Sequence, residues 1–137
     1  MIKASAGISG NLTTVMYHYV RKIKGSQYPN IKGLEERLFR SQIAYLKNHY
    51  NLISPQELRS HILNKTMLPE KACLLTFDDG YIDHYLTVFP ILNASNIKAL
   101  FFAPKSSLVN RVPLSVNKVQ FILATSKNSE DLADELD

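Results

Sequence analysis

Two adjacent carboxylates, Asp78 and Asp79, follow a mostly apolar segment, residues 71–77, and Gly80 comes directly after them. A charged pair beside a buried strand is costly unless water, a cation or a metal ion compensates it. In parallel α/β proteins, functional residues gather at the carboxyl ends of strands. Glycine permits the sharp turn that aims both carboxylates into one cleft. The pair therefore predicts a site for acid–base or metal chemistry, although a single Asp there is usually a helix cap or turn residue.

The carboxylate pair is expected within an alternation of strands and helices. Runs rich in β-branched, aromatic or continuous apolar residues predict strands at residues 12–20, 51–54, 71–79 and 98–103. Apolar spacing and capping residues predict helices at residues 34–50, 54–64, 82–94, 116–125 and 129–136. Residues 21–33 are rich in turn formers and are expected to be a loop.

Two helix features follow from individual residues. Ser54 is expected to cap the second helix, with Pro55 at its first position and Glu57 completing a capping box. Pro90 is expected to bend or interrupt the helix at residues 82–94. The charge of Asp83 at the start of that helix suits the helix dipole, with a supporting role near the site as the alternative.

Alternating strands and helices indicate a parallel sheet with helices outside it. Four strands do not close a barrel, and a complete (β/α) barrel needs about 250 residues, whereas this chain has 137. We therefore expect an α/β fold that is the N-terminal portion of a larger barrel, with residues 1–11 as a flexible N-terminus. Residues 15–19, 74–77 and 99–102 are expected to be parallel strands that are neighbours or near neighbours.

Composition and charge exclude several classes of protein. No apolar run reaches membrane-spanning length. Residues 1–65 hold ten Lys and Arg against three Asp and Glu, but these cations form no regular basic face, so no nucleic-acid partner is expected.

Cys73, the single cysteine, lies in an apolar run and is expected to be a buried hydrophobe. The lack of a signal-peptide pattern and of a cysteine pair favours the cytoplasm. The oligomeric state is not indicated.

The segment Thr76-Phe77-Asp78-Asp79-Gly80 resembles the first signature motif of the polysaccharide deacetylases, which are the NodB-homology or carbohydrate esterase family 4 proteins. The Met-Tyr-His-Tyr segment at residues 16–19 resembles the Tyr-His segment of the first strand in many members. Residues 75–81, 88–92 and 99–102 follow the family's order of strand, helix and strand.

This resemblance implies a distorted (β/α) barrel and a metal-dependent hydrolase that removes N-acetyl groups from a polysaccharide or amino sugar. It implies that Asp78 is the general base acting on a metal-bound water and that Asp79 is a ligand of the metal, often zinc. The N-acetylated glycan is the expected partner. His18 and Tyr81 are the residues expected to contact it, with a structural role as the alternative for each.

The chain departs from the family at the second motif, His-(Ser/Thr)-x-x-His, which supplies the other two metal ligands and is absent here. Histidines occur only at positions 18, 49, 61 and 84, and those after His18 are expected to be surface or packing residues. The family's later motifs, with a further catalytic residue and a leaving-group His, are absent too. We therefore expect the chain alone to be inactive and to bind zinc weakly.

Two other functions are weighed against deacetylation. A truncated, non-catalytic remnant or carbohydrate-binding module would keep the cleft and lack the chemistry. An aspartyl phosphotransferase of the haloacid dehalogenase type also places Asp at a strand end, but it needs Asp-x-Asp, which the adjacent pair does not provide. Phe101 and Phe102 are expected to be core residues.

Overall fold

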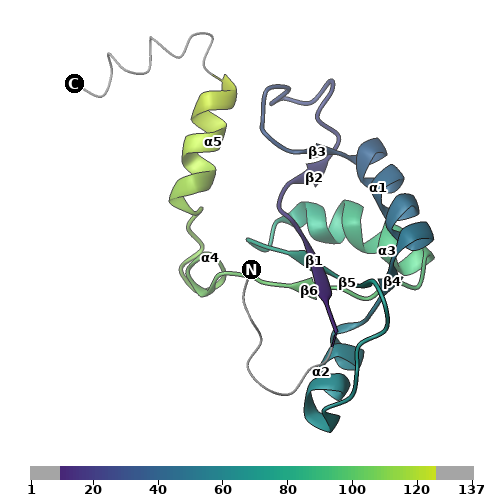
Figure 1. Ribbon diagram of the computed structural model, residues 1–137. Coiled ribbons are helices and arrows are strands. Elements are labelled where there is room, and N and C mark those ends of the chain that lie inside the picture. The colour runs from purple at the N-terminus through teal and green to yellow at the C-terminus, as the bar shows by residue number, and fades with distance from the viewer. Residues whose placement is uncertain (1–9, 126–137) are drawn as a thin grey trace.

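The structure, a computed structural model, describes residues 10–125, and these form a four-stranded sheet whose strands all pair in parallel. The two long strands, β1 (Leu12–Tyr17) and β5 (Ala72–Phe77), pair along their whole length. On the other edge of β5, strand β4 (Asn51–Leu52) pairs with its first residues and β6 (Leu100–Phe101) with its last. Strand β5 is therefore the centre of the sheet (Figure 1).

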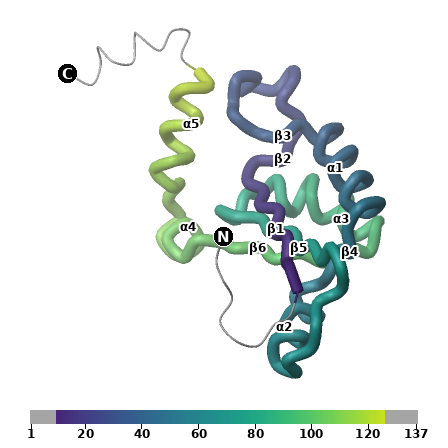
Figure 2. The backbone as a smooth tube through the Cα atoms, in the orientation of Figure 1, coloured from purple at the N-terminus to yellow at the C-terminus, as the bar shows by residue number. Residues whose placement is uncertain are grey.

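Helices follow the strands along the chain. They are α1 (Glu36–His49), α2 (Pro55–Asn64), the π-helix η1 (His84–Val88), α3 (Phe89–Ala94), α4 (Lys105–Asn110) and α5 (Ser115–Thr125). Helices α1 and α3 lie together on one side of β1 and β5, and α5 stands on the other side (Figure 1). Two short strands, β2 (Val20–Arg21) and β3 (Leu34–Glu35), form a separate parallel pair. The tube in Figure 2 shows the chain leaving β6 through α4 into α5, away from α1.

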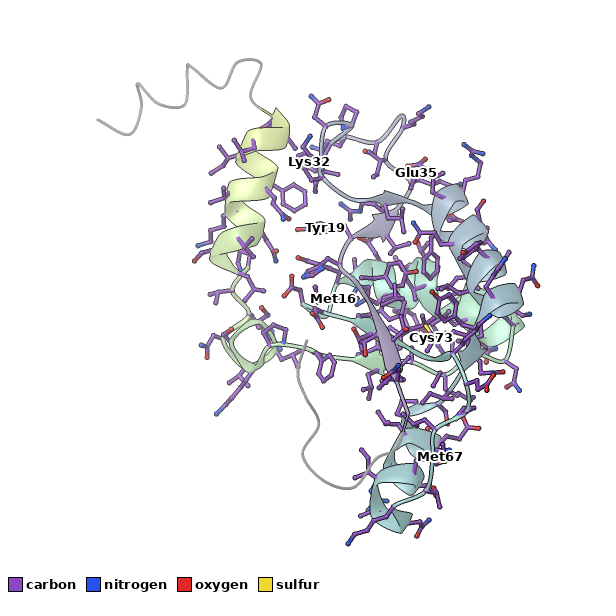
Figure 3. The ribbon with its side chains drawn as sticks, viewed as in Figure 1. Met16, Tyr19, Lys32, Glu35, Met67 and Cys73 are labelled. Atoms are coloured by element: carbon purple, nitrogen blue, oxygen red, sulfur yellow. The ribbon has the colours of Figure 1, made fainter. Side chains whose placement is uncertain are left out.

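The main core lies between β5 and the helices α1 and α3. All six residues of β5 are buried, as a strand covered on both faces requires. Its alternate side chains pack with apolar residues of both helices, and this cluster includes Phe39, Ile43, Leu46, Cys73, Leu75, Phe77, Val88, Ile91 and Leu92. The opposite face of β5 packs with Ile53, Leu68 and Leu58 of the α2 region. Cys73 is fully buried, as predicted (Figure 3).

The predicted parallel arrangement is confirmed, because β1 and β6 are both parallel neighbours of β5. The predicted start of α2 is confirmed as well. The Glu57 N–H donates to Ser54 Oγ at 3.1 Å, and the Ser54 N–H donates to Glu57 Oε2 at 2.6 Å, so the capping box is complete. Pro55 occupies the start of the helix. Local sequence signals were sufficient here because a cap depends on neighbours in the chain.

The expectation that Phe101 and Phe102 are core residues is wrong. These two residues are 44% and 52% exposed, respectively. Within residues 10–125, β6 pairs only with the last two residues of β5, so one of its edges has no neighbouring strand. Phe101 still stacks on Phe77, with ring centroids 4.9 Å apart. An apolar run predicts a strand, but the neighbours of that strand decide its burial.

The segment predicted as one helix at residues 82–94 is divided into η1 and α3. Pro90 lies in the first turn of α3 and has no N–H to donate, but residues 82–94 stay helical throughout, so the hydrogen bonding changes from π to α there and the helix is not interrupted. Helix α4 and the β2–β3 pair were not predicted. The predicted helix at 129–136 and most of the predicted flexible segment at 1–11 lie outside the described residues. No helix in the described part of the chain is long and apolar enough to cross a membrane.

Candidate active site

Asp78 and Asp79 lie directly beyond β5, at the edge where β1 and β6 also end. The Asp78 N–H donates to the Tyr17 carbonyl at 3.0 Å, and the Phe102 N–H donates to the Phe77 carbonyl at 2.8 Å. These two bonds align the carboxyl ends of all three strands. Both Asp residues are partly exposed, next to the fully buried Phe77. The predicted placement of a carboxylate pair at the carboxyl end of a buried parallel strand is therefore observed.

Gly80 makes the turn after the carboxylates possible. Asp79 and Gly80 both have left-handed backbone conformations, with φ of 73° and 63°. Asp tolerates this region better than most residues. At Gly80 a side chain is also excluded by space, because an added Cβ would lie 2.9 Å from Cβ and 3.2 Å from Cα of Ala103. The segment after β6 therefore approaches the carboxylate turn closely enough to require glycine.

Replacing Gly80 with Ala is expected to destabilise the fold by about 3 kcal/mol, because backbone strain and a steric clash act together. Gly25 provides a matched control, since it also has a positive φ of 75° but has no atom within 4 Å of an added Cβ. Gly25→Ala should cost only about 1 kcal/mol. Urea unfolding of both variants measures the difference. Equal losses would show that Ala103 does not restrict the turn.

Tyr81 connects the carboxylate turn to helix α5. Its hydroxyl lies 2.6 Å from Asp79 Oδ2 and 2.7 Å from the side-chain amide of Asn117. Its ring stacks on Tyr19, with centroids 4.0 Å apart and planes 21° from parallel. Burial, followed by the hydrogen bond to Asp79, raises the pKa of Tyr81 far above its usual range. The phenol is therefore a permanent hydrogen-bond donor at ordinary pH.

His84 supports the end of β1 rather than the cleft itself. Its ring is buried, and Nε2 lies 2.9 Å from the backbone carbonyl oxygen of His18. A carbonyl only accepts, so Nε2 carries the proton in this contact. His84 is thus a packing residue, as predicted. His18 follows the last residue of β1, and its side chain is exposed at the same edge as the carboxylates.

Asp83 lies at the start of the helix, as predicted, and its carboxylate pairs with Arg21. Arg21 Nε lies 2.9 Å from Asp83 Oδ2, and Arg21 Nη2 donates to Oδ1 at 3.0 Å. The Asp83 side chain makes no capping hydrogen bond to η1. Its carboxylate is 9% exposed, and the guanidinium lies over the Tyr19 ring at 5.6 Å. This ion pair joins β2 to the segment that follows the carboxylate turn.

Arg21→Ala is expected to destabilise the protein by about 2 kcal/mol, because it leaves the Asp83 carboxylate buried without its partner. Lys22→Ala is the matched control, since Lys22 is the adjacent residue and is exposed. That variant should change the free energy of unfolding by less than about 0.5 kcal/mol. Thermal or urea unfolding compares the two. Similar small effects for both variants would show that the ion pair adds no stability.

A pocket of about 390 Å³ lies beside Tyr81, between the end of β1 and helix α5. Three aromatic residues, Tyr19, Tyr81 and Phe121, and two cationic residues, Arg21 and Lys118, contribute to its lining. Figure 3 shows Tyr19 on the side of the sheet that faces α5. Asp79 is not among the residues that line this pocket, but Tyr81, which does line it, donates a hydrogen bond to Asp79. The surroundings of the carboxylate turn are therefore aromatic on the side of α5.

The described residues do not form a metal site by themselves. Across residues 10–125, no three His, Cys, Asp or Glu side chains are grouped so that they could hold a metal ion. A catalytic zinc usually has three protein ligands, and the turn offers only the carboxylates of Asp78 and Asp79. The donor set present is therefore only part of what a zinc site needs.

Comparisons with known proteins place the carboxylate turn in a deacetylase context. Residues 65–121 match the polysaccharide deacetylase family model. The poly-β-1,6-N-acetyl-D-glucosamine N-deacetylase of Escherichia coli K12 is 44% identical over 72 residues, which are 52% of this chain and 11% of that protein. The chain thus spans a small part of this relative's length.

Two solved structures share the fold over a larger part of the chain. A de-N-acetylase from Aggregatibacter actinomycetemcomitans superposes with a TM-score of 0.62 and 34% identity, over 76% of this chain and 43% of that one. A Streptococcus pyogenes deacetylase in complex with acetate superposes with a TM-score of 0.60 and 25% identity, over 79% of this chain and 50% of that one. The predicted α/β fold, as part of a deacetylase-type barrel, is confirmed.

Proposed function

Since this chain is a partial member of the polysaccharide deacetylase family, we propose that it supplies the first-motif part of an active site that hydrolyses N-acetyl groups of a polysaccharide or amino sugar. The observation that carries this proposal is the pair Asp78 and Asp79, which lies at the carboxyl end of the central buried strand and inside the matched residues 65–121. The E. coli relative's name makes a polymer of N-acetylglucosamine our first candidate substrate.

The reaction needs a base and a means of polarising the acetyl group. Water adds to the acetyl carbonyl, the C–N bond breaks, and acetate and a free amine are formed. The acetate in the S. pyogenes structure has the chemistry of this product. In our proposal Asp78 takes the proton from the attacking water. Asp79 would be one ligand of a divalent metal, for which we propose zinc, and further ligands would be needed because residues 10–125 contain no group of three that could hold it.

The surroundings of the two carboxylates support different roles. Asp79 Oδ2 accepts a hydrogen bond from Tyr81, which holds the side chain in one orientation, as a ligand requires. The Asp78 side chain has no hydrogen-bond partner among residues 10–125, so its carboxylate is free to accept a proton. A base must reach the water that it activates. Asp78 fits the role of base better than Asp79 does.

We propose that His18 contacts the sugar, because its exposed side chain lies at the same sheet edge as the carboxylates. Tyr81 is our second proposed substrate contact. Its hydroxyl already bonds to Asp79 and Asn117, so only the ring of Tyr81 remains for a sugar. Aromatic rings commonly present apolar faces to ligands in such sites.

Acetate release tests this function. The suitable protein is an extended form, defined here as residues 1–137 followed by a segment that carries a His-(Ser/Thr)-x-x-His motif. We expect it to release acetate from N-acetylglucosamine oligomers when zinc is added. A remnant or binding module would bind the oligomer and release none, and this result would reject the enzyme in favour of the alternative.

A further inference from the structure

We propose that Asn117 and Tyr81 form a directed hydrogen-bond chain from helix α5 to Asp79, in which the Asn117 amide donates to the Tyr81 oxygen and the Tyr81 hydroxyl donates to the Asp79 carboxylate. Both are then positioning residues for Asp79. The value of this chain for catalysis rests on the proposed function of Asp79, but its existence does not. It makes α5 a part of the site, although α5 begins 35 residues after Gly80 in the sequence.

The direction of the hydrogen-bond chain follows from the number of protons that the phenol, the carboxylate and the amide can donate. The Tyr81 oxygen lies 2.6 Å from Asp79 Oδ2 and 2.7 Å from Asn117 Oδ1. A phenol has one proton and cannot donate to two acceptors. An ionised carboxylate has no proton to give, so the phenol proton goes to Asp79. The Asn117 amide then satisfies the contact only when it turns by 180° and places Nδ2 toward the phenol oxygen.

The Tyr81 ring is held where the chain requires it. It stacks on Tyr19 at 4.0 Å, and Tyr19 is only 4% exposed. Phe121, one helical turn after Asn117 on α5, packs edge-on against Tyr19 with centroids 6.2 Å apart. Helix α5 therefore contacts Tyr81 directly through Asn117 and indirectly through Phe121 and Tyr19.

The geometry at Asp79 explains why such a chain is needed. Asp79 has a left-handed backbone and is followed by Gly80, so the neighbouring backbone gives little support to the Asp79 side chain. Functional carboxylates need their orientation fixed by surrounding hydrogen bonds. The Tyr81 hydroxyl occupies Oδ2 and leaves Oδ1 for another partner. The chain thus selects one orientation of the carboxylate.

The test uses the 137-residue chain and four variants, which are Tyr81→Phe, Asn117→Ala, Asn117→Asp and Lys118→Ala. The hydroxyl proton of Tyr81 is observed by NMR and assigned by its loss in Tyr81→Phe. We expect a slowly exchanging, downfield resonance that exchanges at least about tenfold faster in both Asn117 variants. Lys118→Ala, at the adjacent exposed position of α5, should leave it unchanged.

The variant Asn117→Asp tests whether residue 117 donates or accepts the hydrogen bond with Tyr81. Aspartate cannot donate and would compete with Asp79 for the phenol proton, so this variant should disturb the chain more than Asn117→Ala does. Position 117 is the third residue of α5, where a negative charge favours the helix dipole, so the helix itself should not suffer. A slow hydroxyl resonance that survives in Asn117→Asp would overturn the proposal. Fast exchange in the unaltered protein would overturn it too.

A double-mutant cycle adds a thermodynamic measurement. Tyr81→Phe and Asn117→Ala should be non-additive, with a coupling of about threefold to tenfold in the unfolding equilibrium constant. Full additivity would contradict a direct bond. Neither measurement uses enzymatic activity. If the hydrogen-bond chain is confirmed but the extended form releases no acetate, only the proposed function is rejected. If acetate is released but the hydrogen-bond chain is not found, only this inference is rejected.

Discussion

In the extended form, Asp79→Ala is expected to lose bound metal and deacetylase activity together, whereas Asp78→Asn loses activity and keeps most of its metal. The physical reason is that a ligand and a base fail in different ways. Removing a ligand prevents the metal from binding. Removing a general base leaves the site assembled but lowers the rate, here by about 10³-fold.

Plasma emission on the purified variants gives the metal content, and acetate release gives the rate. Glu70→Gln is the matched control, because Glu70 is an exposed carboxylate just before the opposite end of the same strand, β5. It should change neither quantity. Equal loss of metal in Asp78→Asn and Asp79→Ala would overturn the assignment of the two roles.

Residues 1–137 alone are expected to be inactive toward N-acetylated sugars, at least about 10³-fold below the extended form, and to bind zinc weakly. Activity requires a base, an activated water and a stabilised oxyanion at the same time. The chain offers a candidate base, Asp78, and a candidate ligand, Asp79, but the described residues do not assemble a group able to hold a metal. One carboxylate is a poor zinc site.

The comparison is a deacetylation assay with added zinc or cobalt, run on the 137-residue chain and on the extended form. Calorimetric titration with zinc measures the difference in affinity. The exposed side chains of Phe101, Phe102 and Ile122 also predict that the short chain associates more readily, so both proteins are assayed over a range of concentrations. Turnover by the short chain at the rate of the extended form would mean that its own histidines, His18 first, bind the metal.

The elements that sequence predicted best depend on local signals. The capping box of Ser54 and Glu57 is read from four consecutive residues, and the buried strand β5 from one apolar run. The carboxylate turn was predicted because Asp78, Asp79 and their flanking residues form a continuous motif. In each case, the residues that interact are close in sequence, so a short window contains the whole pattern.

The interactions that sequence did not predict join distant positions. Arg21 and Asp83 are 62 positions apart, and no local pattern distinguishes this pair from the other charges of a basic N-terminal half. Asn117 lies 36 positions from Tyr81 on a helix that was identified by its apolar residues alone. The exposure of Phe101 was missed for a related reason, because burial depends on which elements cover a strand.

The most direct measurement of the central claim counts both products of one reaction. The extended form is incubated with an N-acetylglucosamine oligomer, and acetate and free amine are measured together, beside a double variant that carries Asp78→Asn and Asp79→Ala. Our account predicts equal amounts of acetate and amine from the unaltered extended form and neither product above background from the double variant. Undiminished release of both products by the double variant would contradict it, because the active site would then lie away from the carboxyl end of β5.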